Sequence, residues 1–310
     1  MLDRELLEKA GELIRAGGLV AFPTETVYGL GANALDAGAV KRIFEAKGRP
    51  LSSPLIVHVD SIAMAQPLVA EWPEKAQMLA ERFWPGPLTL VLPKRDLIPD
   101  LVTAGLPTVG LRVPAHPVAL ELIRAAATPI AAPSANPFTR LSPTSAEHVR
   151  SSLGDRVDLI LDGGPTTVGI ESTVLSMATD PPQILRPGMV SQADIEALVG
   201  PVELAPPVEH GAQSAPGRRR IHYSPHTPLL LVHDETPLPA GRGIYLWLSR
   251  PRREIACHAM PQDAAAYASI LYETLHRLDG EGWDWIAVES PPNAPEWAAV
   301  ADRLRRAAQK

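Results

Sequence analysis

The sequence is poor in cysteine and has no long apolar run. Cys257 is the only cysteine among 310 residues, which excludes an intramolecular disulfide and a cysteine-based metal site and favours a reducing, cytoplasmic location. No segment approaches the ~20 apolar residues of a membrane-spanning helix. The N-terminal stretch carries Asp3, Glu5, Glu8 and Glu12, where a signal peptide needs an uncharged apolar segment. We therefore expect neither secretion nor membrane association.

Several common catalytic motifs are also missing. The sequence has no Gly-x-x-x-x-Gly-Lys-[Ser/Thr] P-loop, no Gly-x-Ser-x-Gly nucleophile elbow and no His-Glu-x-x-His zinc motif. His222 and His226 have the spacing of helical metal ligands, but Pro225 between them disfavours a helix interior. We therefore expect no protein-bound metal.

Positive charge is not in excess. The 29 Lys and Arg residues against 35 Asp and Glu residues give a net charge of -6, which argues against nucleic-acid binding through the overall field. The 45% hydrophobic and 21% charged residues are ordinary for a globular protein with a sizeable core. The 33 prolines are about twice the usual share and predict many rigid loops.

The periodicity of apolar residues predicts an α/β fold. Apolar residues at three- and four-residue spacing predict a helix over 3–16, and Asp36 and Gly48 are positioned to begin and end another. Strand-length apolar runs lie at 19–22, 55–59, 88–92, 109–113, 129–132, 157–161, 173–176 and 183–185. Because some connections are too short for helical crossovers, we expect a mixed sheet.

The chain divides into two predicted domains. Periodicity disappears between about residues 200 and 228, where prolines, glycines and the basic run Arg218-Arg219-Arg220 replace it. We therefore predict a first domain over 1–203, a linker over 204–227 and a small α/β domain over 228–310. The small domain has strand patterns at 229–232, 243–247 and 285–289 and helical patterns at 264–278 and 295–308.

A glycine pair follows the first predicted strand. Gly29, Gly31 and Ala34 fit the Gly-x-Gly-x-x-Gly/Ala pattern of a dinucleotide-binding turn, which leaves a nucleotide-dependent oxidoreductase as one hypothesis. The acidic residue expected about 20 positions later is absent at that spacing. We interpret the segment as a tight turn that lets the backbone approach a ligand, with hydroxyls from Thr24 and Thr26. A purely structural turn is an equal alternative.

Cations and small polar groups follow several predicted elements. Lys47 and Arg49 flank a glycine at a helix end and could contact a triphosphate together, although a helix C-terminus favours cations in any case. Ser134 and Asn136 lie between prolines in a loop after a strand, where α/β sheets bind ligands. Arg112 lies within an apolar strand and needs either a ligand anion or a carboxylate partner.

Many of these motifs, taken in order, resemble one known family. PTETVYGLG, KGRP, PLIVHV, WPGPLTLVL, TVGLRVPAHP, APSANP, GGPTTVGIESTV and LRPG resemble the YrdC-like threonylcarbamoyl-AMP synthases over roughly residues 10–200. APGRRRIHYSPHTPLLLV is similar to the linker and second-domain entry of the long, two-domain form. The resemblance implies a YrdC-like domain with a twisted mixed sheet and flanking helices, plus a small Rossmann-like α/β domain.

The resemblance also implies an activity. Members join L-threonine, bicarbonate and ATP, with Mg²⁺, into threonylcarbamoyl-AMP and pyrophosphate. This nucleotidyltransferase reaction feeds a tRNA threonylcarbamoyl transferase complex, which modifies tRNA to threonylcarbamoyladenosine next to the anticodon. A non-catalytic double-stranded RNA-binding module is the alternative, motivated by the basic linker.

The resemblance assigns the site residue by residue. Lys47 and Arg49 are the implied catalytic residues, and we expect both at the surface of a cleft. The implied ATP-binding residues are Lys47, Arg49, Thr108, Ser134, Asn136, Ser142, Arg186 and Tyr223. The implied threonine-binding residues are Thr24, His58, Arg112 and Ser172.

Overall fold

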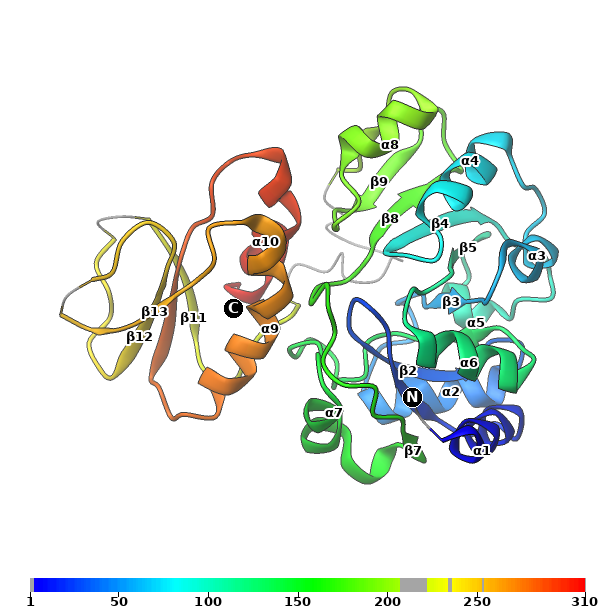
Figure 1. The fold of residues 1–310 in the computed structure, drawn as a ribbon, viewed down its shortest axis with the longest axis horizontal. Coiled ribbons are helices and arrows are strands. Elements are labelled where there is room, and N and C mark those ends of the chain that lie inside the picture. The colour runs from blue at the N-terminus through cyan, green and yellow to red at the C-terminus, as the bar shows by residue number, and fades with distance from the viewer. Residues whose placement is uncertain (1–2, 207–221, 234–235, 253, 310) are drawn as a thin grey trace.

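The structure is a computed structural model of the chain, and it describes residues 3–206, 222–233, 236–252 and 254–309. The described residues form two sheets, each with its own helices (Figure 1). The first sheet contains β1 (Val20–Pro23), β2 (Tyr28–Asn33), β3 (Ile56–His58), β4 (Leu88–Pro93), β5 (Thr108–Arg112), β6 (Ile130–Ala131), β7 (Leu159–Ile160), β8 (Thr173–Ser176), β9 (Gln183–Arg186) and β10 (Glu203–Leu204).

The strand order of the first sheet is β10-β9-β8-β4-β5-β3-β6-β2-β1-β7. The sheet contains parallel pairs, such as β3 with β5, and antiparallel pairs, such as β4 with β5. The predicted mixed sheet is confirmed. Its helices are α1 (Arg4–Arg15), α2 (Ala37–Lys47), α3 (Ile62–Ala65), α4 (Glu74–Phe83), α5 (Asp100–Thr103), α6 (Pro117–Ala126), α7 (Ala146–Leu153) and α8 (Gln192–Val199), with 3-10 turns at Gln66–Leu68 and Gly154–Arg156.

Strand alternation divides the side chains of this sheet between two faces. Successive residues of a strand point to opposite faces, so Val57 and Leu111 join the main core, which also contains residues of α2, α4, α7 and α8. Ile56 packs on the opposite face in a small separate cluster, and α1 and α6 cover another part of that face. His58 and Arg112 share this second face, because each is one residue from Val57 or Leu111 along its strand.

The predicted tight turn over the glycine pair is wrong. Gly29 and Gly31 lie within strand β2, which pairs antiparallel with β1 and places Gly29 opposite Phe22. A Cβ atom on Gly31 would lie 2.7 Å from the Phe22 ring and 2.8 Å from the Ile130 side chain. The glycines therefore allow close packing within the sheet, and no helix opens inside the motif as a dinucleotide-binding turn requires.

The predicted boundaries of α2 are confirmed. The Asp36 side chain accepts hydrogen bonds from the backbone N–H groups of Gly38 and Ala39, which caps the helix N-terminus. Gly48 has φ 62° and ends the helix in the left-handed conformation that glycine adopts without strain. The helix therefore delivers Lys47, its last residue, to the beginning of the following loop.

The second sheet is entirely parallel, with strand order β11-β14-β12-β13. Its elements are β11 (Leu229–Val232), β12 (Gly243–Trp247), β13 (Ala256–Ala259), α9 (Ala264–Asp279), β14 (Trp285–Glu289), a 3-10 turn at Pro295–Trp297 and α10 (Ala298–Ala307). The predicted strands β11, β12 and β14 are confirmed, whereas β13 carries no apolar pattern long enough to predict it.

Helices α9 and α10 lie between their own sheet and the first domain (Figure 1). Val27, Leu141 and Ile170 of the first domain join the same hydrophobic cluster as residues of these two helices. Gly169 has φ 78°, and a Cβ there would lie 2.4 Å from the carbonyl oxygen of Ala268 in α9. The two domains are therefore in close contact.

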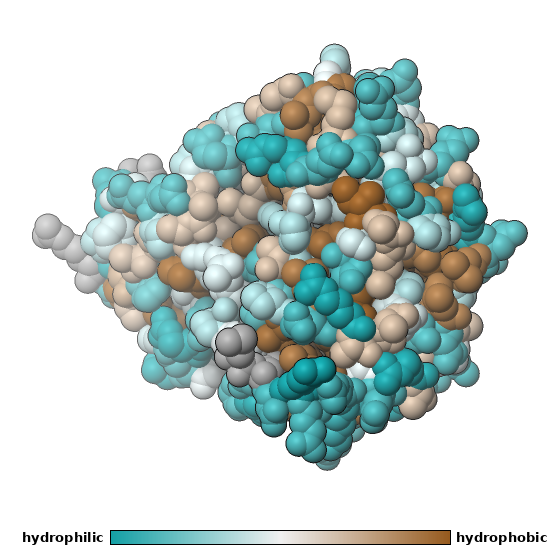
Figure 2. Space-filling model, turned by 45° about the vertical axis from the view of Figure 1, so that its right-hand side comes forward, coloured by the Kyte–Doolittle hydropathy of each residue, from teal (hydrophilic) through white to brown (hydrophobic). Residues whose placement is uncertain are grey.

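Figure 2 shows hydrophilic and hydrophobic residues interspersed on one face of the molecule. Four large hydrophobic side chains are exposed among the described residues, and they come from separate segments: Leu51, Met78, Leu97 and Leu204. None of the described helices combines the length and the apolar character needed to cross a membrane.

Candidate active site

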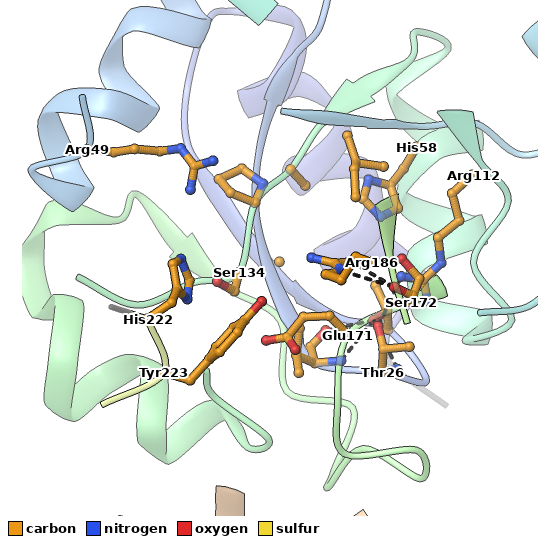
Figure 3. A pocket seen from close by; sticks show the side chains of 16 residues that line it. Thr26, Arg49, His58, Arg112, Ser134, Glu171, Ser172, Arg186, His222 and Tyr223 are labelled. Atoms are coloured by element: carbon orange, nitrogen blue, oxygen red, sulfur yellow. Dashed lines mark hydrogen bonds between the residues drawn. The ribbon is translucent and has the colours of Figure 1, made fainter. Parts of the chain in front are cut away.

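A pocket lies on the second face of the large sheet (Figure 3). Its lining comes from the four strands β2, β3, β5 and β9, from connecting loops and from the described end of the predicted linker. The lining residues are Thr24, Thr26, Val27, Gly29, Arg49, Ile56, His58, Arg112, Ala132, Pro133, Ser134, Glu171, Ser172, Arg186, His222 and Tyr223. Eight of the residues that the resemblance implied are among them.

The lining has two sides (Figure 3). We call the part formed by Thr26, His58, Arg112 and Ser172 the Arg112 side, and the part formed by Arg49, Ser134, His222 and Tyr223 the Arg49 side. Thr24 belongs to the Arg112 side, because its hydroxyl lies 2.8 Å from that of Thr26. Arg186 and Glu171 lie between them. The residues implied to bind threonine thus gather on one side, and several of those implied to bind ATP gather on the other.

Arg112 has a carboxylate partner. Its Nη2 atom lies 2.7 Å from Glu25 Oε1, although the N–H direction does not give a well-aligned hydrogen bond between these two atoms. Arg112 Nη1 donates to Thr26 Oγ1 at 3.0 Å, and Nε donates to the carbonyl oxygen of Gly86 at 3.1 Å. The sequence left open whether Arg112 pairs with a ligand anion or with a carboxylate of the protein, and the structure shows the carboxylate. These contacts hold the guanidinium rigidly against the pocket.

His58 is neutral. Burial and the neighbouring Arg112 charge lower its pKa to about 3. Its ring meets Phe22 edge-on, and Nδ1 has no hydrogen-bond partner among the described residues. His58 lines the pocket, and a buried polar atom without a partner in the protein is available to a ligand. The neutral imidazole can therefore form a hydrogen bond with a bound substrate without adding charge.

Thr24 organises the turn between β1 and β2. Its hydroxyl donates to the carbonyl oxygen of Val27 at 2.6 Å and accepts from the backbone N–H groups of Thr26 and Val27. The turn that sequence analysis placed at the glycines therefore lies at residues 24–27. Its compact geometry presents Thr24 and Thr26 beside Arg112.

Lys47 is not at the surface of the cleft, and that expectation is wrong. The side chain is buried and lies outside the pocket lining. Its ammonium group donates to the carbonyl oxygens of Ser134, at 2.6 Å, and Asn136. Burial, followed by the charges of Arg49 and Arg156, lowers the pKa of Lys47 well below its usual value. Lys47 thus fixes the loop that carries Ser134.

Arg49 reaches the pocket although it is largely buried. Its Nε and Nη2 atoms donate to the carbonyl oxygens of Ser53 and Pro54, and its guanidinium lies 5.8 Å from the centroid of the Phe138 ring. The left-handed Gly48 turns the chain between Lys47 and Arg49. The two cations therefore occupy successive layers, with Arg49 at the pocket and Lys47 behind it.

Three further residues implied to bind ATP lie outside the lining. Asn136 Nδ2 donates to the carbonyl oxygens of Pro137 and Arg140 and so stabilises its own loop. Ser142 donates to Glu171 at 2.6 Å. Thr108 begins β5 while Arg112 ends it, and four residues of strand span about 13 Å. The structure does not bring Thr108 to the pocket.

Ser172 and Arg186 form one unit between the two sides. Arg186 Nε and Nη2 donate to the carbonyl oxygen of Ser172 at 3.1 and 2.9 Å, and Nη2 also donates to Ser172 Oγ at 3.2 Å. Thr89 Oγ1 and Ser172 Oγ are 2.8 Å apart. The residues implied to bind different substrates are thus directly connected.

Residues 222–227 of the predicted linker belong to the described part of the chain, and two of them line the pocket. Tyr223 is buried with φ 62°, a conformation that costs a non-glycine residue about 1–3 kcal/mol. Burial and nearby cations, Arg49 first, lower the pKa of His222 well below its usual value, so its imidazole is neutral. The basic run 218–220 lies outside the described residues.

The resemblance did not assign three polar lining residues, Thr26, Glu171 and His222, although the hydroxyl of Thr26 was expected near a ligand. Each lies next to, or two residues from, a residue that it did assign. No group of three or more His, Cys, Asp or Glu side chains within the described ranges is arranged to hold a metal ion.

Two family models together match almost the whole chain. Sua5_yciO_yrdC, described as "Telomere recombination", matches residues 12–188, and Sua5_C, described as "Threonylcarbamoyl-AMP synthase, C-terminal domain", matches residues 190–309. The second model covers the described part of the linker together with the parallel sheet. Both parts of the chain therefore have recognised relatives.

Curated relatives and solved structures agree with these matches. A protein of Pyrococcus abyssi named "Threonylcarbamoyl-AMP synthase" is 44% identical, over 96% of this chain and 92% of its own. A Bacillus subtilis protein of the same name is 42% identical, over 97% of this chain and 92% of its own.

The structure of Pyrococcus abyssi Sua5 complexed with L-threonine matches with a TM-score of 0.91 at 40% identity, covering 99% of this chain and 95% of that one. The predicted fold class is confirmed. The chain therefore belongs to the Sua5/YrdC family of threonylcarbamoyl-AMP synthases, which are nucleotidyltransferases.

Proposed function

We propose that this chain joins L-threonine, bicarbonate and ATP into threonylcarbamoyl-AMP and releases pyrophosphate. The observation that carries the proposal is that one pocket is lined by Arg49, Arg112 and Arg186 together with small hydroxyl groups and a neutral His58. The solved Pyrococcus abyssi relative is a complex with L-threonine, and the two sides of the pocket in this chain would accept an amino acid and a nucleotide.

Threonine is proposed to bind on the Arg112 side. The Arg112 guanidinium would pair with the threonine carboxylate, because planar guanidinium groups match carboxylates geometrically. Glu25, which lies 2.7 Å from Arg112, keeps the guanidinium in place. The Nδ1 atom of His58 and the hydroxyl groups of Thr24 and Ser172 supply hydrogen-bonding groups for the remaining polar atoms of threonine.

ATP is proposed to bind on the Arg49 side. Arg49 and Arg186 would contact the phosphates, while Lys47 fixes the Ser134 loop from behind and adds positive charge. Asn136 would act by stabilising the same loop, and Ser142 by its hydrogen bond to Glu171. Tyr223, a linker residue that lines the pocket, would contact the bound nucleotide.

The chemistry needs positioning more than a covalent nucleophile. The threonine nitrogen attacks bicarbonate to form a carbamate and water, and a carbamate oxygen then attacks the α-phosphorus of ATP while the bond to pyrophosphate breaks. Both partners of the second step are anions, so cations must reduce their repulsion. The arginines of the pocket supply this positive charge in a site partly shielded from water.

Mg²⁺ enters the proposal as part of the Mg·ATP substrate. Glu171 is the one carboxylate among the described lining residues, and its oxygens already accept hydrogen bonds from Ser142, Tyr272 and Arg303. Mg²⁺ commonly keeps several waters and binds to substrate phosphates. The lining residues therefore fit Mg²⁺ that enters bound to ATP better than Mg²⁺ held permanently by the protein.

The other hypotheses receive less support. The glycine pair lies in an antiparallel strand, which removes the reason for an oxidoreductase. The basic run that motivated double-stranded RNA binding lies outside the described residues, and the relatives' names point to a synthase. We extend the proposal to a cytoplasmic role in which a tRNA threonylcarbamoyl transferase complex receives the product.

Pyrophosphate release tests the proposal. The protein is incubated with Mg·ATP, bicarbonate and L-threonine, and parallel reactions omit one component or replace threonine with D-threonine. We expect release that requires all three components and strongly prefers L-threonine. Release that is indifferent to threonine would overturn the assignment.

A further inference from the structure

Glu171 connects the pocket with the C-terminal domain. Its carboxylate lines the pocket and accepts hydrogen bonds from Ser142 of the first domain and from Tyr272 of α9. Arg303 of α10 donates from Nε to Glu171 Oε2 at 2.7 Å. Burial raises the pKa of Glu171, but Arg303 and Arg186 outweigh it and leave the pKa lowered. The carboxylate is therefore ionised and held from both domains.

Arg303 makes further contacts around the same pocket. It is 1% exposed, and its Nη2 atom donates to the carbonyl oxygens of Glu171, at 3.4 Å, and Pro187, at 3.1 Å. Pro187 directly follows the pocket residue Arg186. The guanidinium therefore ties together the two chain segments that carry Ser172 and Arg186.

Arg303 also contacts the linker. Its guanidinium carbon lies 5.2 Å from the centroid of the Tyr223 ring, within the range of a cation–π interaction. The Tyr272 ring lies 5.9 Å from the Tyr223 ring. Tyr223 is in a strained left-handed conformation, and such a conformation persists only where surrounding contacts hold it.

We propose that Arg303 is a positioning residue of the synthase site, through which the C-terminal domain holds Glu171 and Tyr223 in the geometry that binds ATP. This inference rests on the proposed function. Arg303 is not among the lining residues, so it acts through the groups that it holds. Asp302 accepts a hydrogen bond from its Nη1 atom at 2.7 Å and so also holds the guanidinium in place.

The test compares KM with kcat for pyrophosphate release. In Arg303→Met, which removes the charge and the hydrogen bonds at similar volume, we expect the KM for ATP to rise about tenfold. In Arg303→Lys, which keeps the charge, we expect a smaller rise. A role in folding alone would reduce the amount of active enzyme, and so lower the measured kcat, while leaving KM unchanged.

Two further variants complete the experiment. Tyr272→Phe removes one hydroxyl from Glu171 but keeps the ring, and we expect the KM for ATP to rise about threefold. If Arg303→Met does not fold, the KM of Tyr272→Phe for ATP tests the proposal instead. Arg305→Ala is the matched control on α10, because Arg305 is exposed and its Nε bonds the carbonyl oxygen of Ala301 in its own helix, and we expect wild-type constants.

The outcomes separate the two proposals. An unaltered enzyme that releases no threonine-dependent pyrophosphate contradicts the proposed function. If the unaltered enzyme is active but the folded Arg303→Met variant keeps the wild-type KM for ATP, the role of Arg303 is contradicted and the proposed function stands. If Arg303→Met does not fold, the same conclusion follows from a wild-type KM for ATP in Tyr272→Phe.

Discussion

The Arg112 side and the Arg49 side of the pocket hold their cations in different ways. Arg112 lies 2.7 Å from a carboxylate oxygen of Glu25, whereas Lys47, behind Arg49, donates to the main-chain carbonyl oxygens of Ser134 and Asn136. A carboxylate offsets the formal charge of its partner, while a carbonyl oxygen fixes a cation without an opposite formal charge. The first arrangement suits a zwitterion such as an amino acid, and the second suits a polyanion.

A second cation adds to this difference on the Arg49 side. Lys47 lies behind Arg49, and burial, followed by the charges of Arg49 and Arg156, lowers the pKa of Lys47. On the Arg112 side, His58 stays neutral. Variants of the two sides should therefore separate the binding of the two substrates.

The largest effect is expected from Lys47→Met. Loss of the ammonium removes a charge behind the phosphates and releases the carbonyl oxygens of Ser134 and Asn136, so we expect kcat/KM for ATP to fall by about 10²–10³-fold. The unfolding free energy should fall by about 1–3 kcal/mol. Lys41→Met, at an exposed position of the same helix, is the control. An unchanged kcat/KM in steady-state assays would contradict the account.

Arg112→Gln should act on the other substrate. We expect the KM for threonine to rise about 10–100-fold while the KM for ATP stays within about twofold. The variant also leaves the buried Glu25 without its ion pair, which costs about 3–5 kcal/mol of unfolding free energy.

The double variant Glu25→Gln/Arg112→Gln separates the two roles of Arg112. It should recover most of the stability, measured by urea unfolding, but not the KM for threonine. If removing Glu25 restored threonine binding as well, Arg112 would act only as the partner of Glu25.

A pH effect is expected at the domain contact, away from both sides of the pocket. His276 stacks on His148 with ring centroids 3.8 Å apart and contacts the carbonyl oxygen of Ser142 at 3.1 Å. Burial and His148 lower the pKa of His276 to about 4, while Ser142, Glu273 and Asp279 act in the opposite direction. The native state therefore binds fewer protons than the unfolded state between about pH 4 and 6.5.

Stability should consequently fall as the pH drops through this window. We expect a loss of about 2 kcal/mol of unfolding free energy from this group between about pH 7 and pH 5. Urea unfolding at several pH values measures it. His276→Gln should flatten the dependence, and His233→Gln, at an exposed position, should not. Equal slopes in all three proteins would exclude His276 as the cause.

The smallest effect concerns the protonation of Lys47. Its pKa is lowered, so its charge is lost at a lower pH than that of an ordinary lysine, and a bound polyanion favours the charged form. ATP binding should take up a proton and weaken by up to about tenfold as the pH rises. Calorimetry in buffers of different ionisation enthalpy measures the uptake. Lys47→Met should show none, and a pH-independent wild-type affinity would argue against this coupling.

Local patterns in the sequence predicted most of the fold. The apolar runs around β3, β4 and β8 mark buried strands, and the Asp36 cap and Gly48 mark the ends of α2. Strand β2 was missed because its two glycines indicate turns, whereas here they make room for the Phe22 ring. The need for glycine in this strand comes from a tertiary contact, which a local sequence pattern does not reveal.

The same limit applies to the site. The resemblance named Arg112, His58 and Ser134 as site residues, and the structure places all three in the lining of one pocket. The burial of Lys47 depends on the loop at residues 134–136, and the contact of Arg303 with Glu171 joins positions 132 residues apart. Neither of these two contacts can be recognised from the sequence of the segment in which it lies.

The structure bound to L-threonine and an ATP analogue with a methylene group between the α- and β-phosphorus atoms tests the central claim most directly. We predict the threonine carboxylate at Arg112 and the triphosphate at Arg49 and Arg186, beneath Tyr223. Phosphates placed at Arg112, or a nucleotide outside the pocket, would contradict the division of the two sides.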